Sequence, residues 1–227
     1  VFMNYYEVAI IGSGFFGLRL ALFLAKRGKK VCILEKEKDA FVRASLVNQS
    51  RIHNGYHYPR SYPTALSSHN NYLTFIDEYS KCITKNHKHI YAIAKKNSLV
   101  NSKQFEAFCR NVKIPLYDTD EKIKNLFSKD LIENVYMVNE SVFDAVLIKE
   151  KFLNELSNFS NVNFYFNTTI NNIKINKNLI YLSSKTNVFK SESVYNVTYA
   201  NLNELISLTD YEKIPLKFEL AEIALIR

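Results

Sequence analysis

The chain has 227 residues, of which 47% are hydrophobic and 14% aromatic, and this composition excludes a disordered chain. Its net charge of +8 comes from Lys and Arg residues scattered along the sequence, so we expect no nucleic-acid partner. The sequence contains no uninterrupted run of about 18 apolar residues, which a membrane span requires, so no membrane span is predicted. The three cysteines are well separated and form no CxxC pair, which is typical of a reducing compartment and predicts a cytoplasmic location.

The start of the chain has the pattern of a strand, a glycine turn and a helix. Residues 7–11 are a short apolar run that predicts a buried strand. Gly12, Gly14 and Gly17 follow with GxGxxG spacing. In such a turn the first glycine permits the tight bend, the second lets a pyrophosphate approach the backbone, and the third lets the helix pack on the strand. The helix predicted over residues 15–27 directs its free N–H groups at the phosphates.

A second predicted strand, residues 31–34, ends at Glu35. An acid about 20 residues after the glycines accepts hydrogen bonds from a ribose and disfavours a 2′-phosphate, so we do not expect NADP to bind. The residues predicted to contact a dinucleotide in this unit are Gly12, Ser13, Gly14, Phe15, Phe16, Gly17, Glu35 and Lys36.

The next stretch, residues 40–62, is dense in polar and aromatic side chains and has little amphipathic period. A loop that directly follows a nucleotide-binding βαβ unit is well placed to meet the reactive end of the cofactor. We expect His53 or His57 to accept a substrate proton, because imidazole titrates near neutrality. Arg51 or Arg60 would clamp a substrate carboxylate bidentately.

The middle of the chain alternates predicted helices and strands that have no place in a minimal nucleotide-binding fold. The predicted elements are helices over residues 63–83, 101–112 and 119–127 and strands over residues 90–94 and 135–138. We interpret residues 63–138 as an inserted α+β substrate-side region. His69 is expected to pack in the core, and His87 and His89 lack a nearby Cys or acid, so no metal site is expected.

The last part returns to the nucleotide-binding fold. The predicted elements are a helix over residues 145–158 and strands over residues 163–166, 170–175, 179–182, 188–190, 194–198 and from Ile214 onward. The expected fold class is α/β. The expected divisions are 1–62 for the βαβ unit and its loop, 63–138 for the insertion, 139–205 for the rest of the nucleotide-binding domain, and 206–227 for the start of a substrate sheet.

Four places in the chain resemble the D-amino-acid oxidase-like (DAO) family of FAD-dependent oxidoreductases, which have a Rossmann-like FAD-binding fold. These places are Gly12 to Glu35; Ser45, Asn48 and Ile52 to Gly55; Asp144 to Ile170; and Val194 to Tyr199. The resemblance implies FAD as the cofactor. By position, it implies further cofactor contacts from Ser45, Asn48, His53, Gly55, Thr169 and Thr198.

The family resemblance also implies a reaction, the transfer of a hydride from a small amine or 2-hydroxy acid to flavin N5. The chain departs from the family where its returning strand usually ends in Ala-Thr-Gly, because Tyr199 stands at the glycine position. Family members are also longer, so we expect a C-terminal part to be missing from this sequence.

Two alternatives remain open at this point. Gly14 to Gly17 and His53 to His57 are similar to early motifs of UDP-galactopyranose mutase, an FAD protein that rearranges a nucleotide sugar without net oxidation. The other alternative is a non-catalytic module that binds ADP or FAD.

Overall fold

The computed structural model describes residues 3–84 and 87–218. The chain forms two compact units. Unit 1 comprises residues 1–48 and 145–227, and unit 2 comprises residues 49–144. No helix within the described ranges is both long enough and apolar enough to cross a bilayer.

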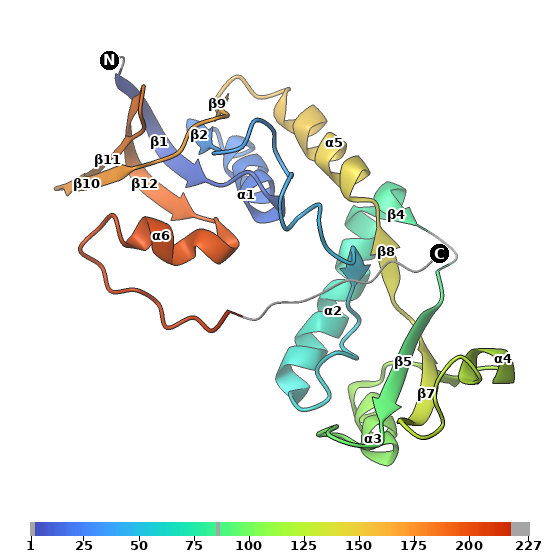
Figure 1. The fold of residues 1–227 in the computed structure, drawn as a ribbon. Coiled ribbons are helices and arrows are strands. Elements are labelled where there is room, and N and C mark those ends of the chain that lie inside the picture. Colours follow the sequence, from blue (N-terminus) through green and yellow to red (C-terminus); the bar gives the residue numbers. More distant parts are fainter. Residues whose placement is uncertain (1–2, 85–86, 219–227) are drawn as a thin grey trace. The chain divides into compact units, whose positions relative to one another are not determined.

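Unit 1 is built on a six-stranded sheet with the strand order β10-β11-β12-β1-β2-β9 (Figure 1). The strands are β1 (Met3–Ile11), β2 (Val31–Leu34), β9 (Val162–Tyr165), β10 (Asn172–Asn176), β11 (Leu179–Ser183) and β12 (Val188–Asn196). β1 pairs in parallel with β2 and β12, and β2 pairs in parallel with β9. β10, β11 and β12 form an antiparallel meander. The parallel strands and their helices confirm the predicted α/β class.

Successive residues of the inner strands point to opposite faces of the sheet and are apolar, so both faces are apolar and helices cover them. Ala9 and Ile11 pack in a cluster with Leu205 of α6 (Leu202–Ile206), which a short 3₁₀ turn (Tyr199–Asn201) precedes. Ile10 points to the opposite face by strand alternation and is fully buried. α1 (Phe15–Ala25) and α5 (Ala145–Leu156) pack together, and the Phe15 and Phe152 rings meet edge to face with centroids 5.4 Å apart.

Two strand predictions in unit 1 need correction. β12 is one continuous strand, whereas two strands over residues 188–190 and 194–198 were predicted. The intervening Ser191 is fully buried and its hydroxyl donates to the Ser193 carbonyl, so a polar sequence that reads as a turn stays in the sheet. The strand predicted from Ile214 is wrong over residues 214–218, which have no regular structure, and the rest of it lies outside the described residues.

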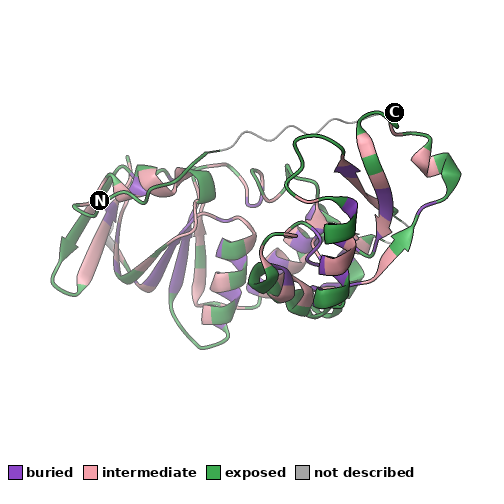
Figure 2. Cartoon of the chain, turned by 90° about the horizontal axis from the view of Figure 1, so that it is seen from below, coloured by how far each residue is buried: buried purple, intermediate pink, exposed green. Residues whose placement is uncertain are grey.

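Unit 2 contains two three-stranded sheets, ordered β3-β8-β4 and β5-β7-β6. Its strands are β3 (Arg51–Ile52), β4 (Ile83–Thr84), β5 (His89–Ala94), β6 (Leu116–Asp118), β7 (Ile132–Val138) and β8 (Ser141–Phe143). Its helices are α2 (Tyr62–Glu78), the 3₁₀ turn Ser80–Cys82, α3 (Ser102–Val112) and α4 (Glu121–Lys124). Figure 2 shows buried residues on both helices and strands of the chain. The helix predicted over residues 63–83 ends earlier than expected, at Glu78. The 3₁₀ turn then leads into β4, which contains Ile83.

Helix α3, predicted over residues 101–112, begins with a capping box at Asn101. The Asn101 side chain accepts a hydrogen bond from the Gln104 N–H at 2.9 Å, and the Gln104 side chain accepts from the Asn101 N–H at 2.9 Å. This reciprocal capping box satisfies two N–H groups that the first turn of a helix leaves unpaired. Cys109 is 1% exposed on the buried face of α3, and burial raises the pKa of its thiol to about 12, which suits a core residue and not a nucleophile.

The turn between β1 and α1 depends on an absent side chain at Gly17. A Cβ at this position would lie 2.0 Å from the Gly12 carbonyl oxygen. Gly12 itself has a φ of +108°, and a Cβ there would lie 3.0 Å from the Val197 carbonyl oxygen. The first and third glycines of the motif therefore let strand, turn and helix approach at backbone contact distance.

We predict that Gly17→Ala destabilises the fold by at least about 2 kcal/mol, since the clash needs backbone movement. Gly28→Ala is the matched control. Gly28 also has a positive φ of +74° but has nothing within 4 Å of its added Cβ, so the conformational strain alone costs about 1 kcal/mol. Urea denaturation of both variants measures the difference. Equal midpoints for Gly17→Ala and the wild type would contradict the close packing at this turn.

Candidate functional site

Glu35 closes the glycine turn at the carboxyl end of β2. Its Oε2 accepts hydrogen bonds from the Ser13 N–H and the Ser13 hydroxyl, both at 2.8 Å. Its Oε1 accepts from the Glu37 N–H at 3.0 Å. A carboxylate has about four acceptor positions and three are used, so Oε1 keeps capacity for one further donor. The acid is thus held in place by the turn and can still accept from one hydroxyl group.

The N-terminus of α1 forms a cradle beside this acid. The first bond along the helix runs from the Leu18 N–H to the Gly14 carbonyl at 3.0 Å, so the preceding N–H groups have no partner inside the helix. One of them, the Phe15 N–H, donates to the Ser45 hydroxyl at 2.9 Å. A Cβ on Gly14 would lie 2.9 Å from that same hydroxyl oxygen. The cradle combines glycine backbone, N–H groups that make no bond within the helix, and the Ser45 hydroxyl. These features fit a pyrophosphate.

The remaining predicted dinucleotide contacts of unit 1 lie around the same end of the sheet. The Thr168 N–H donates to the Glu35 carbonyl at 2.8 Å, and the next residue, Thr169, is exposed. The Val197 N–H donates to the Ile11 carbonyl at 3.0 Å, so β12 delivers Thr198 to the glycine turn. The Thr198 hydroxyl donates to the Asn196 side chain at 2.7 Å.

Tyr199 occupies the position at which the family pattern has glycine, and its backbone has the conformation that glycine favours. Its φ is +56°, and its side chain is 80% exposed. A bulky residue in the left-handed region is strained by about 1–2 kcal/mol. The chain therefore keeps the glycine-type backbone turn at the end of β12 without the glycine.

Other residues predicted to touch the cofactor are placed at the surface of unit 1. Asn48 is exposed, and its amide donates to the Ala44 and Ser45 carbonyls at 2.7 and 3.1 Å. These bonds stabilise the turn that carries Ser45. Phe16 is 76% exposed on the first turn of α1, and Lys36 is exposed directly after Glu35.

In unit 2, two of the predicted catalytic residues meet at a buried acid, Glu140. The Glu140 side chain is fully buried, and Arg51 donates to its Oε2 through Nε. His53 Nδ1 lies 3.6 Å from Glu140 Oε1, just beyond hydrogen-bond distance. The Asn54 N–H donates to that oxygen at 2.9 Å. The Arg51 guanidinium also lies over the Tyr91 ring, 4.7 Å from its centroid.

A second layer of polar contacts fixes the loop that carries His53. Asn54 donates to the Asn139 carbonyl at 3.0 Å and bonds His69 Nδ1 at 2.8 Å through its Oδ1. The Ser68 hydroxyl donates to the His53 carbonyl at 2.9 Å. His69, which was expected to pack in the core, is half-buried and serves as a hydrogen-bond partner instead. This difference arises because the loop folds back onto α2.

The other predicted residues of this loop are not all part of the cluster. The His57 ring stacks on His53 with centroids 5.3 Å apart. Arg60 is exposed in the loop before α2. Gly55 has a φ of +98°, and a Cβ there would lie 2.7 Å from the Ala65 carbonyl oxygen, so packing against α2 by itself requires a glycine.

The electrostatics of the cluster favour an ionised Glu140. Burial alone raises the pKa of this carboxyl, but His53, the Asn54 N–H and the Arg51 charge outweigh burial and hold the pKa below its ordinary value. Desolvation, followed by the neighbouring His53, lowers the pKa of His57, so its ring is neutral at pH 7. Arg51 Nη2 and His53 Nδ1 are buried without a hydrogen-bond partner.

Residues 3–84 and 87–218 contain no group of three or more His, Cys, Asp or Glu side chains that could hold a metal ion. The glycine turn of unit 1 fits the pyrophosphate and ribose of a dinucleotide, and the buried ion pair of unit 2 presents an arginine and two histidines.

The family model described as FAD dependent oxidoreductase (DAO) matches residues 7–201 of this sequence. The chain belongs to this family. The match spans both the glycine turn and the cluster around Glu140, and the family depends on FAD. The resemblance expected from Gly12 to Glu35 and from the later segments is thereby confirmed.

Among curated proteins, the chain is similar to FAD-dependent monooxygenases. It is 31% identical to FPY4 of Fusarium mangiferae over 105 residues. This aligned stretch covers 46% of this chain and 28% of FPY4. It is 35% identical to kojA of Aspergillus flavus over 95 residues. This aligned stretch covers 42% of this chain and 22% of kojA. The chain thus matches less than a third of the length of these relatives.

Among solved structures, the fold is similar to L-proline dehydrogenase from P. horikoshii, with a TM-score of 0.69, 18% identity and coverage of 91% of this chain and 56% of that one. Glycine oxidase from Geobacillus kaustophilus gives a TM-score of 0.67, 18% identity and coverage of 91% and 59%. The FAD-bound L-alpha-glycerophosphate oxidase from Mycoplasma pneumoniae gives 0.65, 20% identity and coverage of 91% and 57%. The chain spans somewhat more than half of each.

Sequence reasoning missed Glu140, the residue around which the unit 2 cluster is built. Glu140 stands alone between β7 and β8, 89 positions from Arg51, and no spacing rule connects them. One signal was available. Glu140 lies between two short apolar runs, and an acid there needs a cationic partner if it is buried.

We predict that Glu140→Gln destabilises the protein by about 3 kcal/mol at pH 7, because Arg51 would keep a buried charge without its counter-ion. The pKa of Glu140 is lowered in the fold, so its contribution is complete above the ordinary carboxyl pKa and is lost as the pH falls through the lower folded pKa. Urea denaturation of both proteins from pH 7 down to pH 3 measures this. The exposed Asp130→Asn is the control, and a difference that stays constant with pH would contradict the ionised pair.

Proposed function

We propose that unit 1 binds FAD and that the protein oxidises a small amine or 2-hydroxy acid. The observation that carries this proposal is the glycine turn, in which Glu35, the α1 N-terminus and the Ser45 hydroxyl converge. Glu35 would accept from the adenosine ribose, and the free N–H groups of α1 would hold the pyrophosphate. The membership of the chain in an FAD-dependent family supports this assignment.

The side chains of unit 2 support the substrate half of the proposal. FAD, when bound, supplies an acceptor for the hydride of a substrate C–H bond. Arg51 would bind the carboxylate of an amino or hydroxy acid through its guanidinium group. His53 or His57 would accept the proton from the substrate N–H or O–H. Glu140 would position Arg51 and His53 for these tasks.

A monooxygenase reaction is the second candidate, because the curated relatives with 31% and 35% identity are named as FAD-dependent monooxygenases. The two reactions differ in the fate of oxygen. An oxidase releases an imino or keto acid without oxygen from O₂, whereas a monooxygenase incorporates one oxygen atom. Mass spectrometry of products formed under ¹⁸O₂ distinguishes them. The mutase resemblance gains no support from the relatives described above.

We predict that the 227-residue chain binds FAD and that Glu35→Gln weakens binding about 10- to 100-fold, because a charged hydrogen bond to the ribose is lost. Flavin absorbance after reconstitution and titration calorimetry with FAD and ADP measure binding. Lys38→Gln, an exposed neighbour, is the control and should bind as the wild type does. Absence of flavin absorbance in the wild type would end the FAD assignment.

We further predict that an amino or 2-hydroxy acid bleaches the bound flavin without oxygen, and that replacement of the proton acceptor by Gln slows this about 10²- to 10⁴-fold. His53→Gln and His57→Gln are compared by anaerobic stopped-flow absorbance, with FAD affinity measured for each. A slower reaction at unchanged affinity identifies the acceptor. Flavin binding without reduction by any such donor would favour the binding-module alternative.

A further inference from the structure

Helix α2 carries a stripe of short polar side chains on one face. Thr64, Ser67, Ser68 and Asn71 have the spacing i, i+3, i+4 and i+7, which aligns them along the helix. Such residues add little to helix stability, because Ser, Thr and Asn compete with the backbone for hydrogen bonds. Intrinsic helix propensity therefore gives no reason for this stripe.

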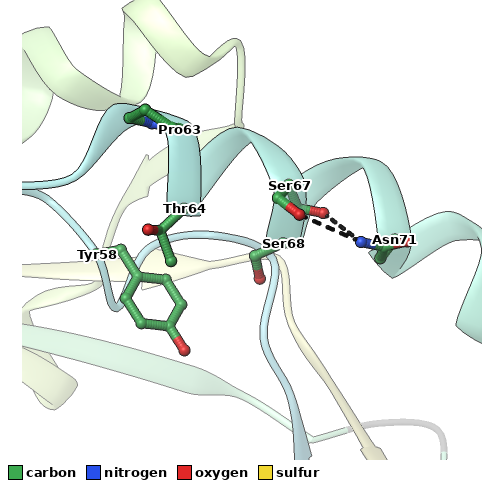
Figure 3. Close-up of a pocket in the computed structure, with 6 residues that line it drawn as sticks. All are labelled: Tyr58, Pro63, Thr64, Ser67, Ser68 and Asn71. Atoms are coloured by element: carbon green, nitrogen blue, oxygen red, sulfur yellow. Dashed lines mark hydrogen bonds between the residues drawn. The ribbon is translucent and has the colours of Figure 1, made fainter.

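The stripe lines a pocket of about 480 Å³ (Figure 3). Its walls are completed by Tyr58 and Pro63, which come from the loop before α2 and from its first turn. In Figure 3 the Tyr58 ring lies beneath Thr64. The pocket thus combines two ring surfaces with hydroxyl and amide groups.

Several polar groups of the pocket keep hydrogen-bonding capacity. The Asn71 amide donates to the Ser67 carbonyl at 2.8 Å and approaches its hydroxyl at 3.5 Å. This bond fixes the Asn71 side chain along the helix, and we find no protein donor to its Oδ1 within residues 3–84 and 87–218. The Thr64 hydroxyl bonds Ser61 at 2.7 Å. Each hydroxyl oxygen retains a lone pair.

The pocket has no charged wall. Residues 61–76 contain no Lys, Arg, Asp or Glu, although 23% of the whole chain is charged. The lining offers no counter-ion to an anionic group. An apolar group would leave the hydroxyls and the amide unpaired. The chemistry that matches this lining is an uncharged group rich in hydroxyls.

The pocket is tied to the cluster around Glu140. Ser68 lines the pocket and donates to the His53 carbonyl at 2.9 Å. Tyr58 meets His57 edge to face, with ring centroids 5.4 Å apart. A ligand that contacts Ser68 and Tyr58 therefore touches residues that also hold the two candidate proton acceptors in place.

We propose that this pocket on α2 is a binding site for a neutral polyhydroxylated group, such as a sugar ring or a polyol chain. The Tyr58 and Pro63 rings would contact its C–H faces, and Ser67 and Asn71 would bond its hydroxyls. The site lies wholly in unit 2 and does not depend on FAD.

The test uses the full 227-residue chain with D-glucose and D-sorbitol as neutral probes, acetate as an anionic probe and cyclohexanol as an apolar one. Ligand-observed NMR gives the dissociation constants. The double variant Ser67→Ala, Asn71→Ala should weaken polyol binding about tenfold, since two hydrogen bonds are lost. Alanine favours helix, so α2 should fold in the variant, and circular dichroism checks this.

Asn70→Ala, the neighbouring exposed asparagine that does not line the pocket, is the matched control and should bind as the wild type does. Saturable binding of either polyol that the double variant weakens supports the proposal. Failure of both polyols to saturate the wild type overturns it, as does equal weakening by Asn70→Ala. Tighter binding of acetate or cyclohexanol than of either polyol overturns the assigned chemistry. A chain that binds polyol but no FAD would disprove the proposed cofactor and leave this site standing.

Discussion

The contact between Gly17 and the Gly12 carbonyl is the constraint on which unit 1 depends. With 2.0 Å between that oxygen and a Cβ built at position 17, the helix can follow the strand at this distance only because position 17 has no side chain. The approach brings the N-terminus of α1 against Glu35 and Ser45. A helix start, an acid and a hydroxyl thereby share one edge of a parallel sheet, where dinucleotides bind in such folds.

Unit 2 is organised by charge instead of close backbone contact. Glu140 is buried, and a buried carboxylate is stable only when paired and hydrogen-bonded. Arg51 and the Asn54 N–H meet this requirement and so bring the strand β3 and the loop after it to one point. The same acid lies 3.6 Å from His53 Nδ1, and Arg51 Nη2 is buried without a hydrogen-bond partner. The Glu140–Arg51 ion pair thus stabilises the buried acid and also holds residues that are candidates for catalysis.

Tyr199 shows that backbone geometry can persist when the favoured residue is absent. Its φ of +56° is held by the neighbouring turn at the end of β12, where the Val197 N–H bonds Ile11. The strain is small beside the sheet pairing that continues along β1 and β12. The left-handed turn at the end of β12 is thus set by the surrounding chain and tolerates a side chain that points into solvent.

The sequence by itself determined the α/β class, the glycine turn, the place of Glu35 at the end of the second strand, and the range of helix α3. These features rest on local spacing and on the period of apolar residues. Tertiary structure alone decided that Ser191 stays in a strand and that Glu140 pairs with Arg51. It also decided that His69 bonds Asn54, although the sequence favoured a core position. The reason is physical. A buried ion pair joins residues 89 positions apart, and a polar residue accepts burial when a distant partner satisfies it.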